Sequence, residues 1–306
     1  MRLFDFCLNV NKNMDFPKEI FRSYDIRGKL ELVTEDVAYQ VGAAVVKEKG
    51  AKTVVIGRDM RETSPKLTAA AIRGVTEMGA NVIDIGLTTT SVFNFAATSL
   101  ENVDIGLMIT ASHNPAEYNG IKVMMTDSNP IPGKELYSLV TKEFEKAETP
   151  GAVEERDVVG MYLDRVLAAG RPDLAGKKIV VDYGNGMGTV SVRELLKKLG
   201  AEVVELYPEQ DARFPNHDAN PAEEETLEDL KKAVVKEGAD IGIALDGDVD
   251  RVRFIDETGE SVSTDHLLGL LSKDVLKQHP GGKVILTLNL SLAAHEAVNE
   301  AGGEVV

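Results

Sequence analysis

A glycine followed by a small residue and a run of β-branched residues recurs along this chain, and this pattern constrains the fold most. It occurs at residues 50–56, 79–85, 200–206 and 238–243, and a fifth copy starts at residue 302. Glycine adopts the left-handed conformation that ends many helices, and a following Val/Ile run is typical of a buried strand. The repeated change from helix to strand predicts an α/β fold with largely parallel sheets.

The length of 306 residues suits about two domains or three small ones. Polar breaks at residues 148–152 and 256–260 suggest the divisions. We expect an extension at 1–13, with Met14 as an alternative start, then domains at 14–152 and 153–256 and a partial domain at 257–306. These are expected to be consecutive three-layer α/β/α domains of similar topology. The third is expected to be incomplete, because its last glycine copy stops shortly after the strand begins.

The charge balance excludes some partners. Fifty acidic residues against thirty-four Lys and Arg give a net charge of −16, which disfavours binding to nucleic acid or to anionic lipid. No apolar run approaches the length of a membrane-spanning helix. The single cysteine, Cys7, excludes an internal disulfide and suits a reducing compartment, so we expect a cytoplasmic protein.

The first candidate site follows the apolar run at residues 105–109. This run predicts a buried strand, and it stops abruptly in small polar residues that include Ser112. In open α/β sheets, the loops that follow such strands commonly carry binding or catalytic groups. The Asn-Pro and Asn-Gly pairs that follow are equally typical of a plain turn, so this stretch alone leaves both interpretations open.

The second candidate site is formed by Asp246, Asp248 and Asp250, which alternate after the apolar run at 241–245. Such concentrated negative charge favours a bound cation, and ligands that are all oxygens favour Mg²⁺, Mn²⁺ or Ca²⁺. An EF-hand would need glycine where Arg251 stands and helices on both sides. A solvated acidic turn remains the structural alternative.

Three other stretches are less informative. The aspartate stretch also resembles the opening of haloacid-dehalogenase-type phosphatases, but too little chain follows Asp250 for the rest of that motif. The glycine-rich turn at 184–188 departs from a dinucleotide fingerprint, so no nicotinamide cofactor is expected. Long irregular loops such as 207–221, which contains His217, often contact ligands. Arg27 stands beside Gly28, where the spacing fits either an arginine that contacts an anion or an ordinary surface arginine.

Six stretches together resemble the α-D-phosphohexomutases, the phosphomannomutase/phosphoglucomutase group. They lie in the family's order at residues 21–28, 57–61, 110–115, 118–122, 182–186 and 246–251, within a resemblance that covers residues 15–306. The serine stretch and the aspartate stretch are specific in combination. The resemblance implies Mg²⁺-dependent interconversion of hexose 1-phosphates and 6-phosphates of glucose or mannose, through a phosphoserine and a hexose 1,6-bisphosphate intermediate. A phosphosugar is the implied partner, and we expect a monomer or a homodimer.

The resemblance also implies roles for individual residues. Ser112 would be the phosphoserine, and its phosphate would join three carboxylates around Mg²⁺: Asp246, Asp248 and Asp250. His113 and Lys122 would move protons or stabilise the transferring group. The implied phosphate-binding and cleft-lining residues are Arg251, Arg27, Tyr24 and His217.

The chain also departs from the family pattern. Family members have four domains, and the loops that select the sugar and bind its phosphate would come after residue 306. We therefore expect the chain to hold Mg²⁺ but to turn over poorly. The alternatives are a phosphoglucosamine mutase and a non-catalytic binding or regulatory protein on the same scaffold.

Overall fold

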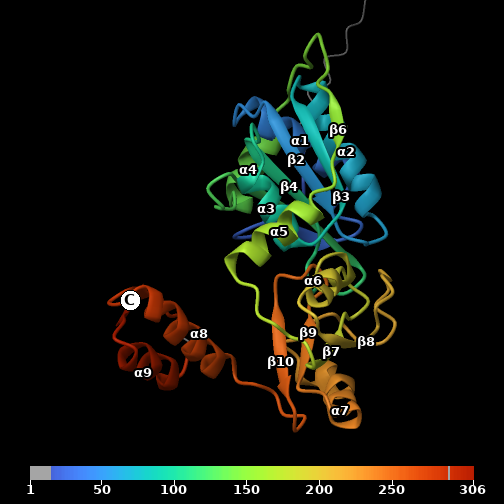
Figure 1. Ribbon diagram of the computed structural model, residues 1–306. Coiled ribbons are helices and arrows are strands. Elements are labelled where there is room, and N and C mark those ends of the chain that lie inside the picture. Colours follow the sequence, from blue (N-terminus) through green and yellow to red (C-terminus); the bar gives the residue numbers. More distant parts are fainter. Residues whose placement is uncertain (1–14, 289) are drawn as a thin grey trace, which may run out of the picture.

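A computed structural model describes residues 15–288 and 290–306. The extension expected at 1–13, the alternative start at Met14 and Cys7 lie outside the described residues. Figure 1 shows two α/β units one after the other, with a smaller part at the C-terminal end. Within the described ranges, no helix is both long and apolar enough to cross a membrane.

Among the described residues, the first unit contains six strands and five α-helices, preceded by a short 3-10 helix at Lys18–Ile20. Its strands are β1 (Ile26–Lys29), β2 (Thr53–Arg58), β3 (Asn81–Leu87), β4 (Ile105–Ile109), β5 (Tyr118–Met125) and β6 (Val153–Glu155). Its helices are α1 (Glu35–Lys47), α2 (Ser64–Glu77), α3 (Thr90–Ser99), α4 (Gly133–Val140) and α5 (Val159–Ala169). The sheet order is β1-β5-β4-β2-β3-β6, with β5 antiparallel to both of its neighbours and the other pairs parallel.

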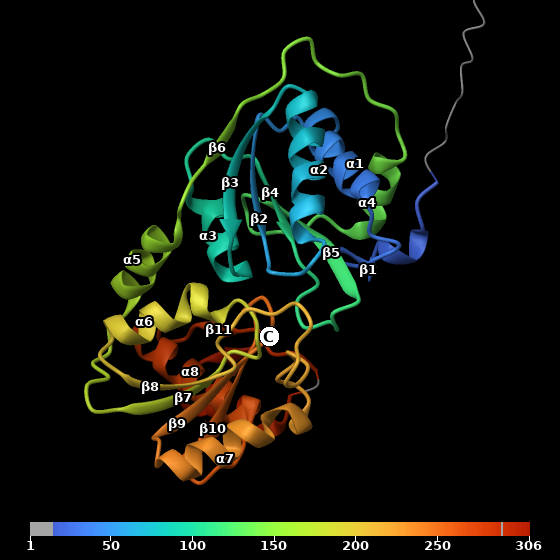
Figure 2. The ribbon, with the colours of Figure 1, turned by 90° about the vertical axis from the view of Figure 1, so that its right-hand side faces the viewer.

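Both faces of the first sheet are covered, as Figure 2 shows. Successive residues of a strand point to opposite faces, and β2 illustrates the result. Val54 and Ile56 pack in the core under α1, α2 and α4, whereas Val55 packs in the core under α3 and the start of α5. The expected three-layer α/β/α arrangement is therefore confirmed for this unit.

The second unit repeats the topology of the first. Its strands are β7 (Lys178–Asp182), β8 (Glu202–Leu206), β9 (Ile241–Leu245) and β10 (Val252–Asp256), and its helices are α6 (Val192–Lys198) and α7 (Glu228–Glu237). The order β10-β9-β7-β8 matches β5-β4-β2-β3, with the first strand antiparallel in both cases. Helix α7 covers one face of the sheet and α6 the other. The serine stretch after β4 and the aspartate stretch after β9 thus occupy equivalent places in two similar units.

The recurring glycines behave as their pattern predicts. Each ends a helix or turn with positive φ, between 59° and 93°, a region that residues with a Cβ rarely adopt. A strand follows every one of them. The five residues are Gly50, Gly79, Gly200, Gly238 and Gly302.

The chain returns to the first sheet after the polar break at 148–152, where we expected a boundary between domains. Strand β6 pairs with β3 beyond it, and α5 then packs against α3. Composition marks the loop correctly but does not reveal that the chain returns to the same sheet. Strand β6 and helix α5 thus pack with the first unit, and the exact boundary between the domains stays a prediction.

The C-terminal part contains α8 (Thr264–Gln278), β11 (Lys283–Val284), α9 (Leu292–Glu300) and β12 (Glu304–Val305). The two short strands pair in parallel, as the fifth glycine copy suggested. This part lies away from the junction of the first two units in Figure 1.

Helices α1 and α2 touch so closely that a substitution can test their packing. A Cβ added at Gly74 would lie 2.1 Å from the carbonyl oxygen of Tyr39, and one at Gly42 would lie 2.4 Å from that of Ala71. Gly74→Ala should therefore lower the free energy of unfolding by about 2 kcal/mol, because neither backbone can give way easily.

Urea denaturation measures this effect, and Gly160→Ala on α5 is the matched control. A Cβ at Gly160 meets nothing within 4 Å. The control should be neutral or stabilising by up to about 1 kcal/mol, since alanine favours a helix over glycine. Equal effects of the two substitutions would contradict the close-packing argument.

Candidate active site at the junction of two units

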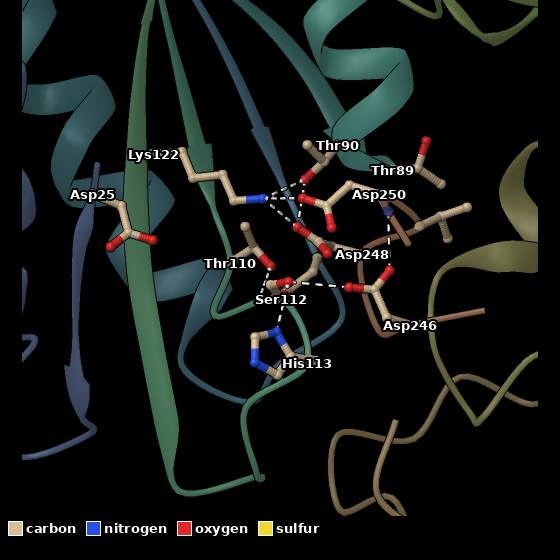
Figure 3. A network of polar contacts seen from close by, with 12 residues as sticks. Asp25, Thr89, Thr90, Thr110, Ser112, His113, Lys122, Asp246, Asp248 and Asp250 are labelled. Atoms are coloured by element: carbon tan, nitrogen blue, oxygen red, sulfur yellow. Dashed lines mark hydrogen bonds and ion pairs between the residues drawn. The ribbon is translucent and has the colours of Figure 1, made fainter. Parts of the chain in front are cut away.

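Ser112 lies where β4 ends, in a loop whose backbone is unusual. Its φ is 54°, in the left-handed region that a serine seldom occupies, and its side chain is buried. The hydroxyl of Thr110 accepts a hydrogen bond from the Ser112 N–H at 2.9 Å. In this conformation the Ser112 hydroxyl points across to the second unit and donates to Asp246 Oδ2 at 3.1 Å (Figure 3). Backbone strain at such positions is common in active sites, where the surrounding structure maintains it.

The three aspartates form one cluster at the end of β9. Each can offer a carboxylate oxygen within 4.8 Å of the others. Asp246 and Asp248 are fully buried, while Asp250 is partly exposed. The backbone N–H groups of Asp250 and Arg251 donate to Asp246 Oδ1, which fixes the outline of the loop.

The chemistry of this cluster fits a divalent cation. Asp248 Oδ1 is buried and has no hydrogen-bond partner, so a ligand is needed to satisfy it. Burial, together with the charges of Asp248 and Asp250, raises the pKa of Asp246 to about 8. A bound cation would relieve both features, and a donor set of oxygens suits Mg²⁺.

Lys122, on β5, meets the cluster from the first unit. Its Nζ donates to Asp248 Oδ2 and to Asp250 Oδ2, at 2.7 Å each, and to the Thr90 hydroxyl at 3.3 Å. Burial alone would lower the pKa of Lys122, but the two aspartates outweigh it and raise that pKa. The same lysine holds the pKa of Asp248 below its usual range against the effect of burial. Lys122 is therefore a fixed positive charge at the aspartate cluster, and it lines the same cavity as Ser112.

His113 follows Ser112 and lies against it. Its Nδ1 is 3.2 Å from the Ser112 Oγ. Burial lowers the pKa of His113, and the positive charges of Arg251 and Arg27 lower it further. A neutral imidazole has one nitrogen free to accept a proton, as a general base requires.

A cavity of about 590 Å³ opens beside these groups. It is lined by Ser112, His113, Lys122 and three further residues that the sequence singled out: Tyr24, Arg27 and Arg251. The Arg27 Nη1 donates to Asn114 Oδ1 at 2.9 Å, and Arg27 also pairs with Asp25. Tyr24 is 73% exposed, and Arg251 is half exposed near Asp250. Positive groups thus gather at one place on an acidic chain.

The sequence reasoning missed the contribution of α3. The Thr90 N–H donates to the Asp248 carbonyl oxygen at 2.8 Å, and its hydroxyl donates to Asp248 Oδ2 at 2.5 Å. Ser91 Oγ donates to the Val249 carbonyl at 2.8 Å. The signal was the run of three threonines at 88–90, directly after the carboxyl end of β3. These contacts dock the aspartate loop on the N-terminal turn of α3, where the helix dipole favours negative charge.

His217 neither lines this cavity nor belongs to the aspartate cluster. Its Nε2 is 3.0 Å from Asp182 Oδ2, its Nδ1 is 2.9 Å from the Asp218 carbonyl, and its ring packs edge-on against Tyr207. These contacts lie within the second unit and hold the long loop to the end of β7. A substrate-binding role for His217 stays a prediction.

The pair of His217 and Asp182 predicts a pH-dependent stability. Burial lowers the pKa of His217, but the hydrogen bond and charge of Asp182 outweigh burial and raise it. The protonated ring therefore stabilises the fold fully below the unfolded pKa of about 6.5, and this contribution is lost as pH rises through the folded pKa. His217→Asn should remove on the order of 1 kcal/mol at about pH 6 and less at about pH 8.5.

Urea unfolding of both proteins at the two pH values measures this difference. His279→Asn is the control, because His279 is exposed at the end of α8. A difference between wild type and His217→Asn that is the same at both pH values would contradict the prediction.

Two α/β/α units of the same topology, with one serine–carboxylate site at their junction, define a class of proteins built from repeated domains. Two family models match the chain: phosphoglucomutase/phosphomannomutase alpha/beta/alpha domain I at residues 18–150, and domain II of the same family at residues 161–259. The chain belongs to the phosphoglucomutase/phosphomannomutase family.

Curated relatives agree with this family. The chain is 39% identical over 298 residues to a phosphoglucomutase of Neisseria gonorrhoeae, covering 94% of this chain and 64% of the relative. It is 36% identical over 309 residues to a phosphomannomutase/phosphoglucomutase of Pseudomonas aeruginosa, covering 98% and 65%. The chain thus spans just under two thirds of the length of these relatives.

A solved structure has the same architecture. A phosphoglucomutase/phosphomannomutase family protein from Burkholderia thailandensis superimposes with a TM-score of 0.89 at 34% identity. The match covers 95% of this chain and 66% of that protein. The expected fold class and family are confirmed.

Proposed function

We propose that this chain carries the phosphoserine and metal-binding part of a hexose-phosphate mutase that acts on glucose or mannose phosphates. One observation carries the proposal most directly. The Ser112 hydroxyl, at the end of one unit, donates to Asp246 in a carboxylate cluster of the next unit, 134 residues later. A serine beside a cation site can hold a phosphoryl group whose charge the cation offsets. A structural serine in a plain turn has no need of such a cluster.

The proposed chemistry starts with a phosphoryl group on Ser112 Oγ. When a sugar hydroxyl attacks, its oxygen forms a bond to phosphorus, and the bond from phosphorus to Ser112 Oγ breaks. His113, whose Nδ1 lies 3.2 Å from Ser112 Oγ, is placed to accept the proton of the sugar hydroxyl and to return it to the departing Ser112 oxygen. The Lys122 ammonium is placed to stabilise the oxygens of the transferring group. Asp246, Asp248 and Asp250 would hold Mg²⁺, with an oxygen of the phosphoserine as a further ligand. Bound Mg²⁺ would neutralise part of the negative charge of the phosphoryl group.

The product of the first transfer is a hexose bisphosphate. For an isomerisation, its other phosphoryl group then returns to Ser112, which restores the phosphoserine. In this proposal the cavity lined by Tyr24, Arg27 and Arg251 binds the phosphosugar through its positive side chains. Location in the cytoplasm and a monomeric or dimeric state remain predictions.

The test follows phosphate on the protein. The purified chain is incubated with Mg²⁺ and glucose 1,6-bisphosphate or mannose 1,6-bisphosphate, and intact mass is measured. We expect the mass of one added phosphoryl group, and faster loss of that group after adding glucose 1-phosphate or mannose 1-phosphate than after glucosamine 1-phosphate. Fastest loss with glucosamine 1-phosphate would favour a phosphoglucosamine mutase. Sugar binding without any phosphoprotein would favour the non-catalytic alternative.

A further inference from the structure

Arg61 is buried at the centre of the serine loop, the segment at 110–118 that follows β4 and contains Ser112. Nothing proposed above gives Arg61 a role. It follows β2, and its side chain is 1% exposed. Burying a guanidinium is costly unless its charge is paired and its donors are satisfied. Asp59 supplies the pairing charge, with the Arg61 Nε 3.2 Å from Asp59 Oδ2. Asp59 is itself held by the Ser64 hydroxyl at 2.6 Å.

The rest of the guanidinium is encircled by carbonyl oxygens of the serine loop. Nη2 donates to Ser112 at 2.9 Å and to Asn114 at 2.5 Å. Nη1 donates to Pro115 at 2.7 Å and to Tyr118 at 3.0 Å. All five N–H groups of a guanidinium are thereby used. No other side chain offers a planar fork that can gather four carbonyls at once, and lysine has only three donors on a point charge.

The second unit also contacts Arg61 and the serine loop. The ring of Phe214, from the loop that follows β8, lies 5.3 Å from the Arg61 guanidinium carbon. Phe214 is 6% exposed and adopts a φ of 48°, which non-glycine residues rarely do. Gly247 approaches the same loop from the aspartate stretch: a Cβ there would lie 2.7 Å from the Ser112 carbonyl oxygen. The Ser112 carbonyl is therefore held by Arg61 of one unit and packed against the backbone of the other.

We propose that Arg61 is a positioning residue that keeps the serine loop in the shape that aims Ser112 Oγ at the aspartate cluster, and that Phe214 couples this shape to docking of the second unit. The consequence for phosphoryl transfer rests on the proposed function. The loop geometry itself does not. Arg61 touches no reacting atom, so it acts through the Ser112 backbone.

The first measurement is independent of catalysis. Hydrogen exchange of backbone amides, followed by mass spectrometry, is compared for wild type, Arg61→Lys, Phe214→Leu and the control Arg58→Lys. Arg58 ends β2 three residues before Arg61 and lines a different cavity. Exchange across residues 110–120 should rise at least about tenfold in Arg61→Lys and less in Phe214→Leu, with the control unchanged. Unchanged exchange in Arg61→Lys overturns the proposal, and unchanged exchange in Phe214→Leu overturns the coupling to the second unit.

The second measurement follows phosphorylation of Ser112 by glucose 1,6-bisphosphate. Arg61→Lys should lower the maximal rate by about 100-fold, because small misplacements of a reacting group have effects of that size. The half-saturating bisphosphate concentration should stay within about twofold, because the cavity arginines are untouched.

Added guanidinium ion should restore part of the rate in Arg61→Ala and none in Ser112→Ala. A wild-type rate in Arg61→Lys overturns the proposal. A wild-type chain that takes up no phosphate counts against the proposed function, while hydrogen exchange still decides the role of Arg61.

Discussion

Replacing Ser112 by alanine is expected to abolish phosphoryl transfer to this chain. The Ser112 hydroxyl is the group that donates to the aspartate cluster, His113 lies against it, and Lys122 lines the same cavity. Removing the attacking oxygen leaves no bond to form, so phosphate uptake from a hexose 1,6-bisphosphate should fall by at least about 10⁴-fold. Intact-mass measurement after incubation with Mg²⁺ and the bisphosphate detects the change.

Ser23→Ala is the matched control for this prediction. Ser23 lines the same cavity, but its side chain is exposed. It should take up phosphate like wild type. Equal uptake by Ser112→Ala and wild type would place the phosphate on another residue, and peptide mapping would then identify it.

The second large effect is expected at Asp248. Asp248→Asn keeps the shape of the side chain but removes the charge that a divalent cation would balance. Saturating Mg²⁺ should stabilise the wild-type chain by about 2.7 kcal/mol when its concentration is a hundred times the dissociation constant. Asp248→Asn should lose nearly all of this gain.

The measured quantity is the Mg²⁺-dependent change in unfolding free energy, not the stability itself. Asp248 also contacts Thr90 and Lys122, so its replacement will alter stability without metal. Glu257→Gln is the control, because Glu257 lies outside the cluster but would be the twelfth and last ligand position of an EF-hand loop that starts at Asp246. It should keep the wild-type response. No response to Mg²⁺ in wild type would support a plain acidic turn.

Local signals were strong enough to predict the elements and the two site-bearing loops. The helix end before each β-branched run requires positive φ, which glycine adopts without strain. This feature depends on one residue, and all five glycines have positive φ. Three aspartates at alternating positions after an apolar strand concentrate negative charge, and this pattern alone indicates a cation site. Ser112 and the aspartate cluster follow equivalent strands, β4 and β9, and they meet where the two units contact each other.

The sequence by itself therefore determined the α/β class, the repeated units and the two loops that form the site. Only the tertiary structure decided that β6 and α5 return to the first unit, that Thr90 docks the aspartate loop, and that Arg61 lies inside the serine loop. The physical reason is the range of the interactions. Helix ends, strands and charge clusters depend on residues a few positions apart, whereas the partner of a buried charge or carbonyl is chosen by packing. Lys122 and Asp248 are 126 residues apart, and only the folded chain brings them to 2.7 Å.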